Sequence, residues 1–132
     1  LEGSVRSLDE DMRDLVQERL SQVAEGTAAA NQCEITIEYE RGYPITDNNE
    51  EATQHAISVA SSVSEVDTDT PPIMPSEDFA YMLMEKPGAF IFLGNGDSQM
   101  LHNPEYIFDD EAIPFGSSWY AGMVEERLPI TG

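Results

Sequence analysis

Residues 33–46 read CEITIEYERGYPIT, and this stretch decides the class of fold that the sequence predicts. Apolar and polar side chains alternate over residues 33–40, which is the period of a strand with one buried and one solvated face. Gly42 and Pro44 then end the strand. Cys33 falls on the apolar side, where a buried, inert thiol is a better interpretation than a nucleophile or a metal ligand.

The residues before this strand predict a second strand and a helix. The opening LEGSVRSL has the character of a strand entered partway with no Met before it, so we expect a start set by processing or cloning. Ser7 to Glu10 form a capping-box pattern, and apolar residues at helical spacing continue to about Ala30. Residues 1–46 therefore predict the order strand, helix, strand.

Two further helices are predicted after the first 46 residues. A second capping pattern over residues 47–50 starts a helix that contains His55, which we place on the solvent side and not at a metal. Ser76 can begin a short helix that continues through Met84. A strand or extended connector that ends in prolines, residues 64–75, links the two.

The last third of the chain supplies a central strand and a final helix. GAFIFLG, residues 88–94, is apolar on both faces, as in a strand covered by helices on both sides, and we interpret Gly94-Asn95-Gly96 as a tight turn. The final helix begins near Pro114, and its Trp119 and Tyr120 are expected in the core. The order of elements, β-α-β and then α-β-α-β-α, predicts an α/β fold.

Composition excludes several classes of protein. The 132 residues carry 26 acidic against 6 basic side chains, a formal charge of −20, which repels phosphate backbones and argues against nucleic-acid binding. The acids are spread along the chain, as on a hydrated surface, and a dedicated cation-binding surface is the weaker alternative. No apolar run of about 18 residues and no signal peptide are present, so we expect no membrane contact and a cytoplasmic location. The single cysteine rules out an internal disulfide framework and a cysteine-based zinc module.

His102 is the residue with the most chemical promise. It lies in MLHNPEYIFDDEAIPFG, residues 100–116, in a short turn before Pro104 that follows the predicted central strand. A turn made rigid by proline can aim a neutral imidazole at a metal, and Asn103 or a nearby acid could orient the other ring nitrogen. From the residues alone, an ordinary loop histidine is the commoner alternative.

Five segments, in order along nearly the whole chain, resemble the C-terminal third of the M20 metallopeptidase family. The resemblance is strongest to its amidohydrolase branch, which includes hippurate hydrolases and N-acyl-amino-acid amidohydrolases. The segments are LEGSVRSLDEDMRDLVQERL, YERGYPITDN, MPSEDFAYML, GAFIFLGNG and LHNPEYIFDDEAIPFG.

This resemblance implies a two-domain enzyme. Residues 1–46 would be the second half of a ferredoxin-like lid that mediates homodimerisation, and residues 47–132 the C-terminal segment of a zinc-peptidase-like catalytic α/β domain. His102 would be the last ligand of a dinuclear Zn or Mn site. The other ligands and the general-base glutamate are expected upstream, and Cys33 does not match the cysteine ligand of the family.

Three more positions carry over as substrate-binding residues. Arg6 matches an arginine that can grip a substrate carboxylate with a planar fork, and an exposed strand arginine is the alternative. Ser76 and Glu77 match a loop beside the substrate. Pro75 stands where the family usually has glycine, and proline removes a backbone donor from that loop.

The resemblance therefore implies the C-terminal portion of a metal-dependent amidohydrolase that cleaves N-acyl amino acids or small peptides. One histidine cannot hold a hydrolytic metal, so these residues by themselves are expected to be inactive. The alternative is a non-catalytic dimerisation or binding module that keeps part of the fold, because unpaired strand edges invite another chain.

Overall fold

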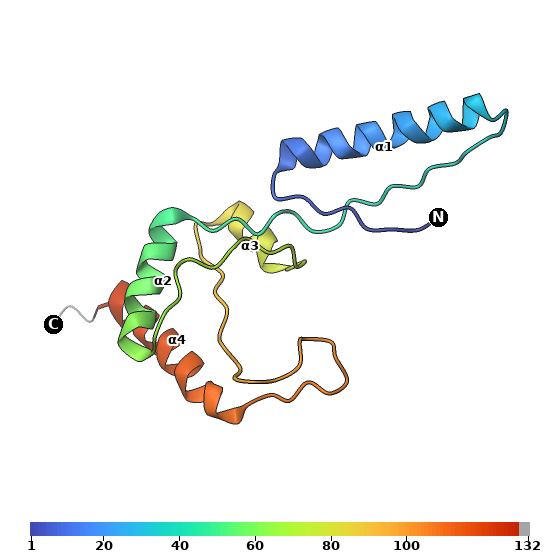
Figure 1. The fold of residues 1–132 in the computed structure, drawn as a ribbon. Coiled ribbons are helices and arrows are strands. Elements are labelled where there is room, and N and C mark those ends of the chain that lie inside the picture. The colour runs from blue at the N-terminus through green and yellow to red at the C-terminus, as the bar shows by residue number, and fades with distance from the viewer. Residues whose placement is uncertain (130–132) are drawn as a thin grey trace. The chain divides into compact units, whose positions relative to one another are not determined.

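The computed structural model describes residues 1–129, and all of its regular elements in that range are helical. No helix among these residues is both long and apolar enough to cross a membrane. Two compact units form, one from Leu1–Asp47 with Pro72–Glu85 and one from Asn48–Pro71 with the residues from Lys86 onward. Figure 1 shows the elements in chain order: α1 (Glu10–Ala30), α2 (Glu50–Val63), α3 (Phe79–Glu85), the 3-10 helix η1 (Asp110–Ala112) and α4 (Ile113–Arg127).

Both long N-terminal helices begin at a capping side chain close to the predicted start. The Asp9 carboxylate accepts from the Met12 amide at 2.8 Å, and the Asn49 side chain accepts from the Ala52 amide at 3.0 Å. The predicted capping boxes are therefore wrong by two residues in each case. Asp9 has the extended conformation of a cap residue directly before Glu10, whereas the Ser7 hydroxyl accepts from the Asp9 amide at 3.1 Å.

The predicted strands do not form among the described residues, so the α/β fold and its ferredoxin-like lid are not confirmed. Residues 33–46 and 88–95 have no regular secondary structure. A strand is stable only when its amides and carbonyls pair with a neighbouring strand, and residues 1–129 supply none. The alternating polarity predicted that these segments lie in a sheet, and the described residues form no such sheet.

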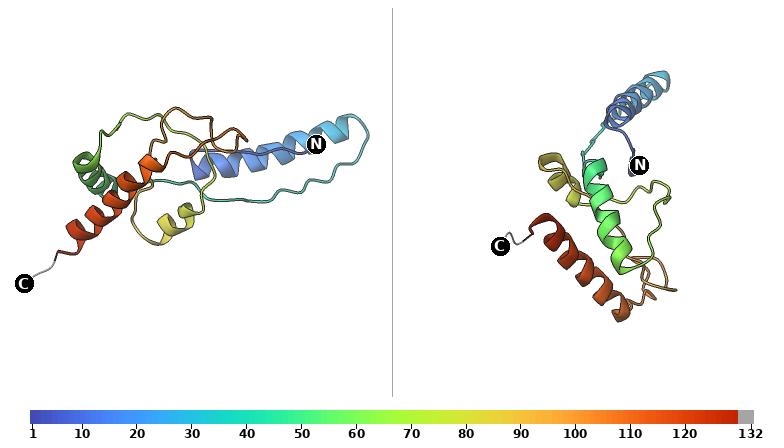
Figure 2. Two further views of the ribbon diagram at one scale, coloured as in Figure 1. Left: turned by 90° about the horizontal axis from the view of Figure 1, so that it is seen from below. Right: turned by 90° about the vertical axis from the view of Figure 1, so that its left-hand side faces the viewer.

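In the first unit, the chain turns back after α1 and returns to the beginning of that helix. Cys33 donates its amide to the Ala28 carbonyl at 3.0 Å, which starts the return, and Figures 1 and 2 show the chain running back along α1. Tyr43 then meets Tyr81 of α3 edge to face, with ring centroids 5.7 Å apart. Cys33 is exposed, so the prediction of a buried thiol is wrong, because its strand has no sheet to cover it.

In the second unit, α2 and α4 pack side by side, as Figure 2 shows. Ala56 and Val59 of α2 are buried there, and the Trp119 indole donates to the Ala56 carbonyl at 3.1 Å. Trp119 is half-buried in this contact, as expected of a packing residue. Tyr120 is 70% exposed, so its predicted place in the core is wrong; its ring meets the Trp119 ring edge to face, with centroids 4.9 Å apart.

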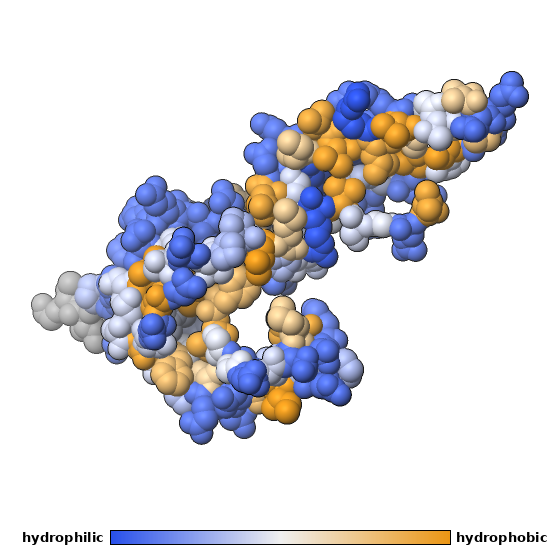
Figure 3. All heavy atoms as spheres, viewed as in Figure 1, coloured by the Kyte–Doolittle hydropathy of each residue, from blue (hydrophilic) through white to orange (hydrophobic). Residues whose placement is uncertain are grey.

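The chain keeps much apolar surface in contact with solvent. Its accessible surface is 11053 Å², whereas a compact protein of this mass exposes roughly 6,900 Å². Figure 3 shows apolar side chains gathered along α1, where Met12, Leu15 and Val23 are among the exposed residues. Exposed apolar residues thus follow one another along α1.

Candidate functional site

His102 occupies a tight turn in a strained conformation. The Asn103 amide donates to the Met100 carbonyl at 3.1 Å, which closes a β-turn around Leu101 and His102. The φ angle of His102 is +68°, in the left-handed region. A turn of this kind favours glycine at that position, and a residue with a side chain costs about 1–3 kcal/mol there. His102 therefore carries its imidazole at a backbone position where glycine would be more stable.

A second turn follows directly. The Tyr106 amide donates to the Asn103 carbonyl at 3.0 Å, and the Glu105 amide donates to the Asn103 side-chain oxygen at 2.9 Å. Asn103 thus braces the turn after His102 through its side-chain oxygen. The His102 side chain itself is exposed.

The loop that carries His102, residues 96–106, is closed at its base by Asn95. The Asn95 amide nitrogen donates to the Ile107 carbonyl at 2.7 Å, and its oxygen accepts from the Asp109 amide at 2.8 Å. The Ile107 amide donates to the Ser98 hydroxyl at 3.0 Å, which adds a second cross-link. The prediction of a simple Gly-Asn-Gly turn missed this function of Asn95. An amide side chain between two glycines was the available signal.

The described residues do not complete a metal site. No group of three or more histidine, cysteine, aspartate or glutamate side chains in residues 1–129 lies close enough together to hold an ion. A catalytic metal uses about three protein ligands and an open position. His102 fits the role of one donor, a neutral imidazole on a rigid corner, and the other donors would have to come from outside this range.

His55 has a structural environment in the second unit. Its Nδ1 lies 3.2 Å from Glu126 of α4, and its Nε2 lies 3.8 Å from Glu51 in its own helix. Both ring nitrogens thus face carboxylates, and the contact with Glu126 joins α2 to α4. The ring is half-buried, so it lies at the edge of the helix contact and not fully on the solvent side as predicted.

Arg6 and Ser76, two predicted substrate-binding residues, come together in the first unit. The Arg6 Nη1 donates to the Met74 carbonyl at 2.6 Å and to the Ser76 hydroxyl at 3.2 Å. The contact spans 70 residues of sequence. Glu77, the third predicted residue, is half-buried and accepts the Ala80 amide through its backbone carbonyl at the start of α3.

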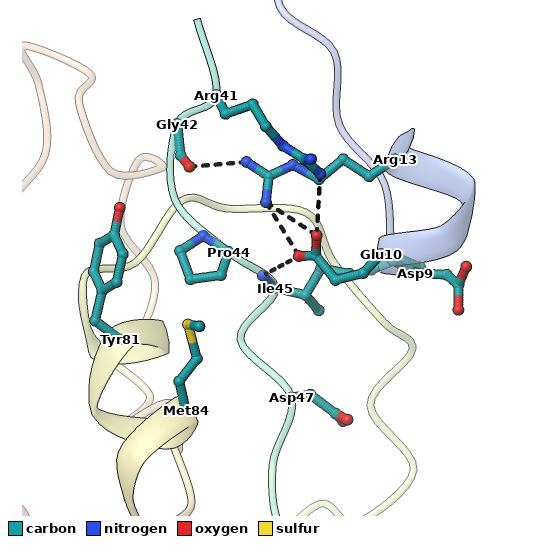
Figure 4. Close-up of a pocket in the computed structure, with 11 residues that line it drawn as sticks. Asp9, Glu10, Arg13, Arg41, Gly42, Pro44, Ile45, Asp47, Tyr81 and Met84 are labelled. Carbon is teal, nitrogen blue, oxygen red and sulfur yellow. Dashed lines mark hydrogen bonds and ion pairs between the residues drawn. The ribbon is translucent and has the colours of Figure 1, made fainter. Parts of the chain in front are cut away.

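An open pocket of about 540 Å³ lies elsewhere in the first unit (Figure 4). Glu10 lines this pocket and accepts from Arg13 at 3.1 Å, from Arg41 at 3.4 Å and from the Ile45 amide at 3.3 Å. Arg13 also donates to the Gly42 carbonyl at 2.8 Å. The guanidinium groups of Arg13 and Arg41 thus bond to other residues of the first unit, and the cluster ties α1 to residues 41–45. The lining residues are Leu8, Asp9, Glu10, Arg13, Arg41, Gly42, Pro44, Ile45, Asp47, Tyr81 and Met84.

Comparison with known proteins gives a consistent result. The model of peptidase family M20/M25/M40 matches residues 5–126. Hippurate hydrolase of Campylobacter jejuni is 36% identical over 128 residues, which are 95% of this chain and 33% of that protein. N-acetyldiaminopimelate deacetylase of Pediococcus pentosaceus is 32% identical over 130 residues, 97% of this chain and 34% of that protein. No solved structure matches the chain significantly.

The chain thus spans about a third of the length of the curated relatives it matches. The family match covers nearly all of the chain and includes Arg6, the Ser76 loop and the His102 loop. The chain belongs to peptidase family M20/M25/M40.

Proposed function

We propose that this chain is the C-terminal portion of a metal-dependent amidohydrolase that cleaves the amide bond of N-acyl amino acids or small peptides. The observation that carries the proposal is the similarity, over 95% and 97% of the chain, to a hippurate hydrolase and an N-acetyldiaminopimelate deacetylase. The first name specifies hydrolysis of hippurate, and the second specifies removal of an acetyl group from N-acetyldiaminopimelate.

The proposed architecture has two α/β parts, a lid that includes residues 1–46 and a catalytic domain that includes residues 47–132. Two sequence features support it: the alternating polarity of residues 33–40 and the two-sided apolar character of residues 88–94. The exposed apolar face of α1 is consistent with a sheet, or a second copy of the lid, that covers it.

His102 is the proposed ligand that this chain contributes to a dinuclear Zn or Mn site. The strained backbone supports the assignment, because residues held in sparsely populated conformations cluster at functional sites. A bound divalent metal supplies activation of water and polarisation of the amide carbonyl. The contribution of the chain is a neutral imidazole at a fixed corner.

Arg6 is the proposed partner of the substrate carboxylate, with Ser76 and Glu77 at the same substrate pocket. Only one terminal nitrogen of Arg6 makes the two bonds to Met74 and Ser76, and the side chain is exposed. The Ser76 contact holds the guanidinium in place, so the remaining N–H groups can form paired bonds with an anion.

The rival proposal is a non-catalytic dimerisation or binding module, and the unpaired extended segments and exposed apolar face favour it. The reading frame before Leu1 separates the two proposals. A frame that continues into histidine and acidic metal ligands supports the enzyme, and an in-frame start codon at or just before Leu1 supports the module.

The direct test uses the protein of the full reading frame in a cytoplasmic expression host. The purified protein is loaded with Zn²⁺ or Mn²⁺ and assayed on N-acetyl and N-benzoyl amino acids, together with the His102→Ala variant. We expect turnover that the variant loses along with bound metal. Turnover by the variant close to that of the parent would remove His102 from the site.

A further inference from the structure

Asn95 links the two ends of the His102 loop with both functional atoms of its side chain. Its amide nitrogen donates to Ile107 and its oxygen accepts from Asp109, two residues further along. In a sheet, the peptide groups of a neighbouring strand donate to one residue and accept from the residue two positions further on. The Asn95 carboxamide takes the place of one such peptide group. The Asn95 side chain is half-buried.

The outgoing end of the loop is also tied to the helical part of the unit. The Asp109 carboxylate accepts from the Glu111 amide at 3.0 Å and thereby caps η1, in which Ala112 is buried. Helix α4 follows at once. Asn95 therefore connects the loop to a firm support, since Asp109 is fixed on one side by the cap and on the other by the carboxamide.

We infer that Asn95 is a positioning residue whose side chain fixes the turn that presents His102. Gly96, at φ +73°, turns the chain into the loop immediately after Asn95, and Ser98 adds the second cross-link through Ile107. With both limbs held, the loop is a closed Ω-loop and its strained central turn keeps one conformation. The effect of Asn95 on metal binding rests on the proposed function of His102, whereas the closure of the loop by Asn95 does not.

The chain offers a matched control in Asn48. Its side-chain nitrogen donates to the Phe90 carbonyl at 2.9 Å, and its oxygen accepts from the Phe90 amide at 2.7 Å. Asn48 thus forms the same kind of two-point bond to a backbone in the same unit. Its bonds do not involve the loop of residues 96–106. Asn48→Asp therefore makes the same change from carboxamide to carboxylate, and it should not loosen the His102 turn.

The first experiment measures amide hydrogen exchange in the 132-residue chain. Asn95→Asp keeps an acceptor for Asp109 but loses the donor to Ile107, and Asn95→Ala loses both. We expect Asn95→Ala to speed exchange of the Asn103 amide, which closes the His102 turn, about tenfold, as the loss of two hydrogen bonds predicts. Asn48→Asp leaves that amide unchanged.

One further readout and one further variant keep the exchange experiment decisive. Trp119 fluorescence shows whether α2 and α4 are still packed in each variant. Ser98→Ala removes the bond between Ser98 and the Ile107 amide, and it should speed exchange of the Asn103 amide less than Asn95→Ala does. Unchanged protection of the Asn103 amide in both Asn95 variants would overturn the inference.

The second experiment measures metal content and kcat in the protein of the full reading frame, for the parent, Asn95→Asp, Asn48→Asp and His102→Ala. If Asn95 acts through His102, Asn95→Asp lowers both readouts, as His102→Ala does, whereas the matched control Asn48→Asp lowers neither. Equal losses in Asn95→Asp and Asn48→Asp indicate a general structural role and overturn the inference. If His102→Ala changes neither readout, the proposed function fails, and the exchange result alone decides the loop closure.

Discussion

Gly122 of α4 lies so close to Val59 of α2 that a Cβ atom on the glycine would come within 2.7 Å of the Val59 Cγ1 atom. Val59 is buried at this contact, 5% exposed. The absence of a side chain at Gly122 is thus what allows the two helices to approach this closely. Trp119, which is also on α4, donates from its indole to the Ala56 carbonyl of α2.

The first prediction is that Gly122→Ala weakens the α2–α4 contact. Alanine improves helix propensity by about 1 kcal/mol, but overpacking at a buried contact costs about 1–3 kcal/mol, so we expect a net loss. Urea unfolding followed by Trp119 fluorescence measures it, because this is the only tryptophan.

Two variants control this prediction. A Cβ atom on Gly26 of α1 would have no neighbouring atom within 4 Å, so Gly26→Ala should raise the helical content with no opposing clash. Val59→Ala removes the atom that clashes, so the double variant with Gly122→Ala should recover part of the loss. A higher urea midpoint for Gly122→Ala alone would contradict the assignment.

The second prediction is that Glu10→Gln loosens the attachment of residues 41–45 to α1 in a salt-dependent way, while Asp14 still pairs with Arg41 at 2.6 Å. The variant loses the charge that attracts Arg13 and Arg41. Because the Glu10 side chain is half exposed, the loss is about 0.5–1 kcal/mol for the cluster. At 1 M salt, where the screening length is about 3 Å, parent and variant should converge.

Amide exchange of Ile45, which donates to Glu10, is the measurement for this cluster. Glu18→Gln is its control, since Glu18 lies on the same helix and accepts only from the neutral Gln22 side chain among the bonds of the described residues. An equal change in both variants would show that the effect is one of net charge and not of the cluster.

The third prediction is that Arg6→Lys raises KM for N-acyl amino acids about tenfold or more in the complete protein, with a smaller change in kcat. A lysine keeps the charge but loses the planar fork that binds a carboxylate through two parallel bonds. Steady-state kinetics measure the split, and Arg19→Lys, on the surface of α1, is the control. An unchanged KM would leave Arg6 as a support of residues 74–76.

The fourth prediction separates the backbone of His102 from its ring. Glycine accepts a φ of +68° freely, whereas alanine is destabilised there by about 1 kcal/mol or more. His102→Gly should therefore be more stable than His102→Ala, while both lose metal and turnover equally. Thermal unfolding and metal content measure the two effects, and full metal content in either variant would show that the imidazole is no ligand.

The sequence predicted the helices well because each helix is a local object. The spacing of apolar residues and the oxygen-bearing side chains near Asp9 and Asn49 placed both starts within two residues. The choice between Ser7 and Asp9 as cap was beyond the pattern, since both side chains can accept an amide and only the path of the chain decides.

The strands and the site depended on distant partners, which explains what the sequence missed. Alternation over residues 33–40 describes a strand only if another strand pairs with it. His102 could be singled out from its turn, but its support by Asn95 requires the chain to return at Ile107 and Asp109. The bond between Arg6 and Ser76 likewise joins positions that no local pattern relates.

The exposed thiol of Cys33 has a practical consequence, because it is the only cysteine of the chain. A thiol-reactive acceptor dye would attach to the first unit at one point. The single tryptophan of the second unit, Trp119, is a natural donor for energy transfer to that dye. The spacing of the two units in the 132-residue chain can therefore be followed in solution with no engineered residue.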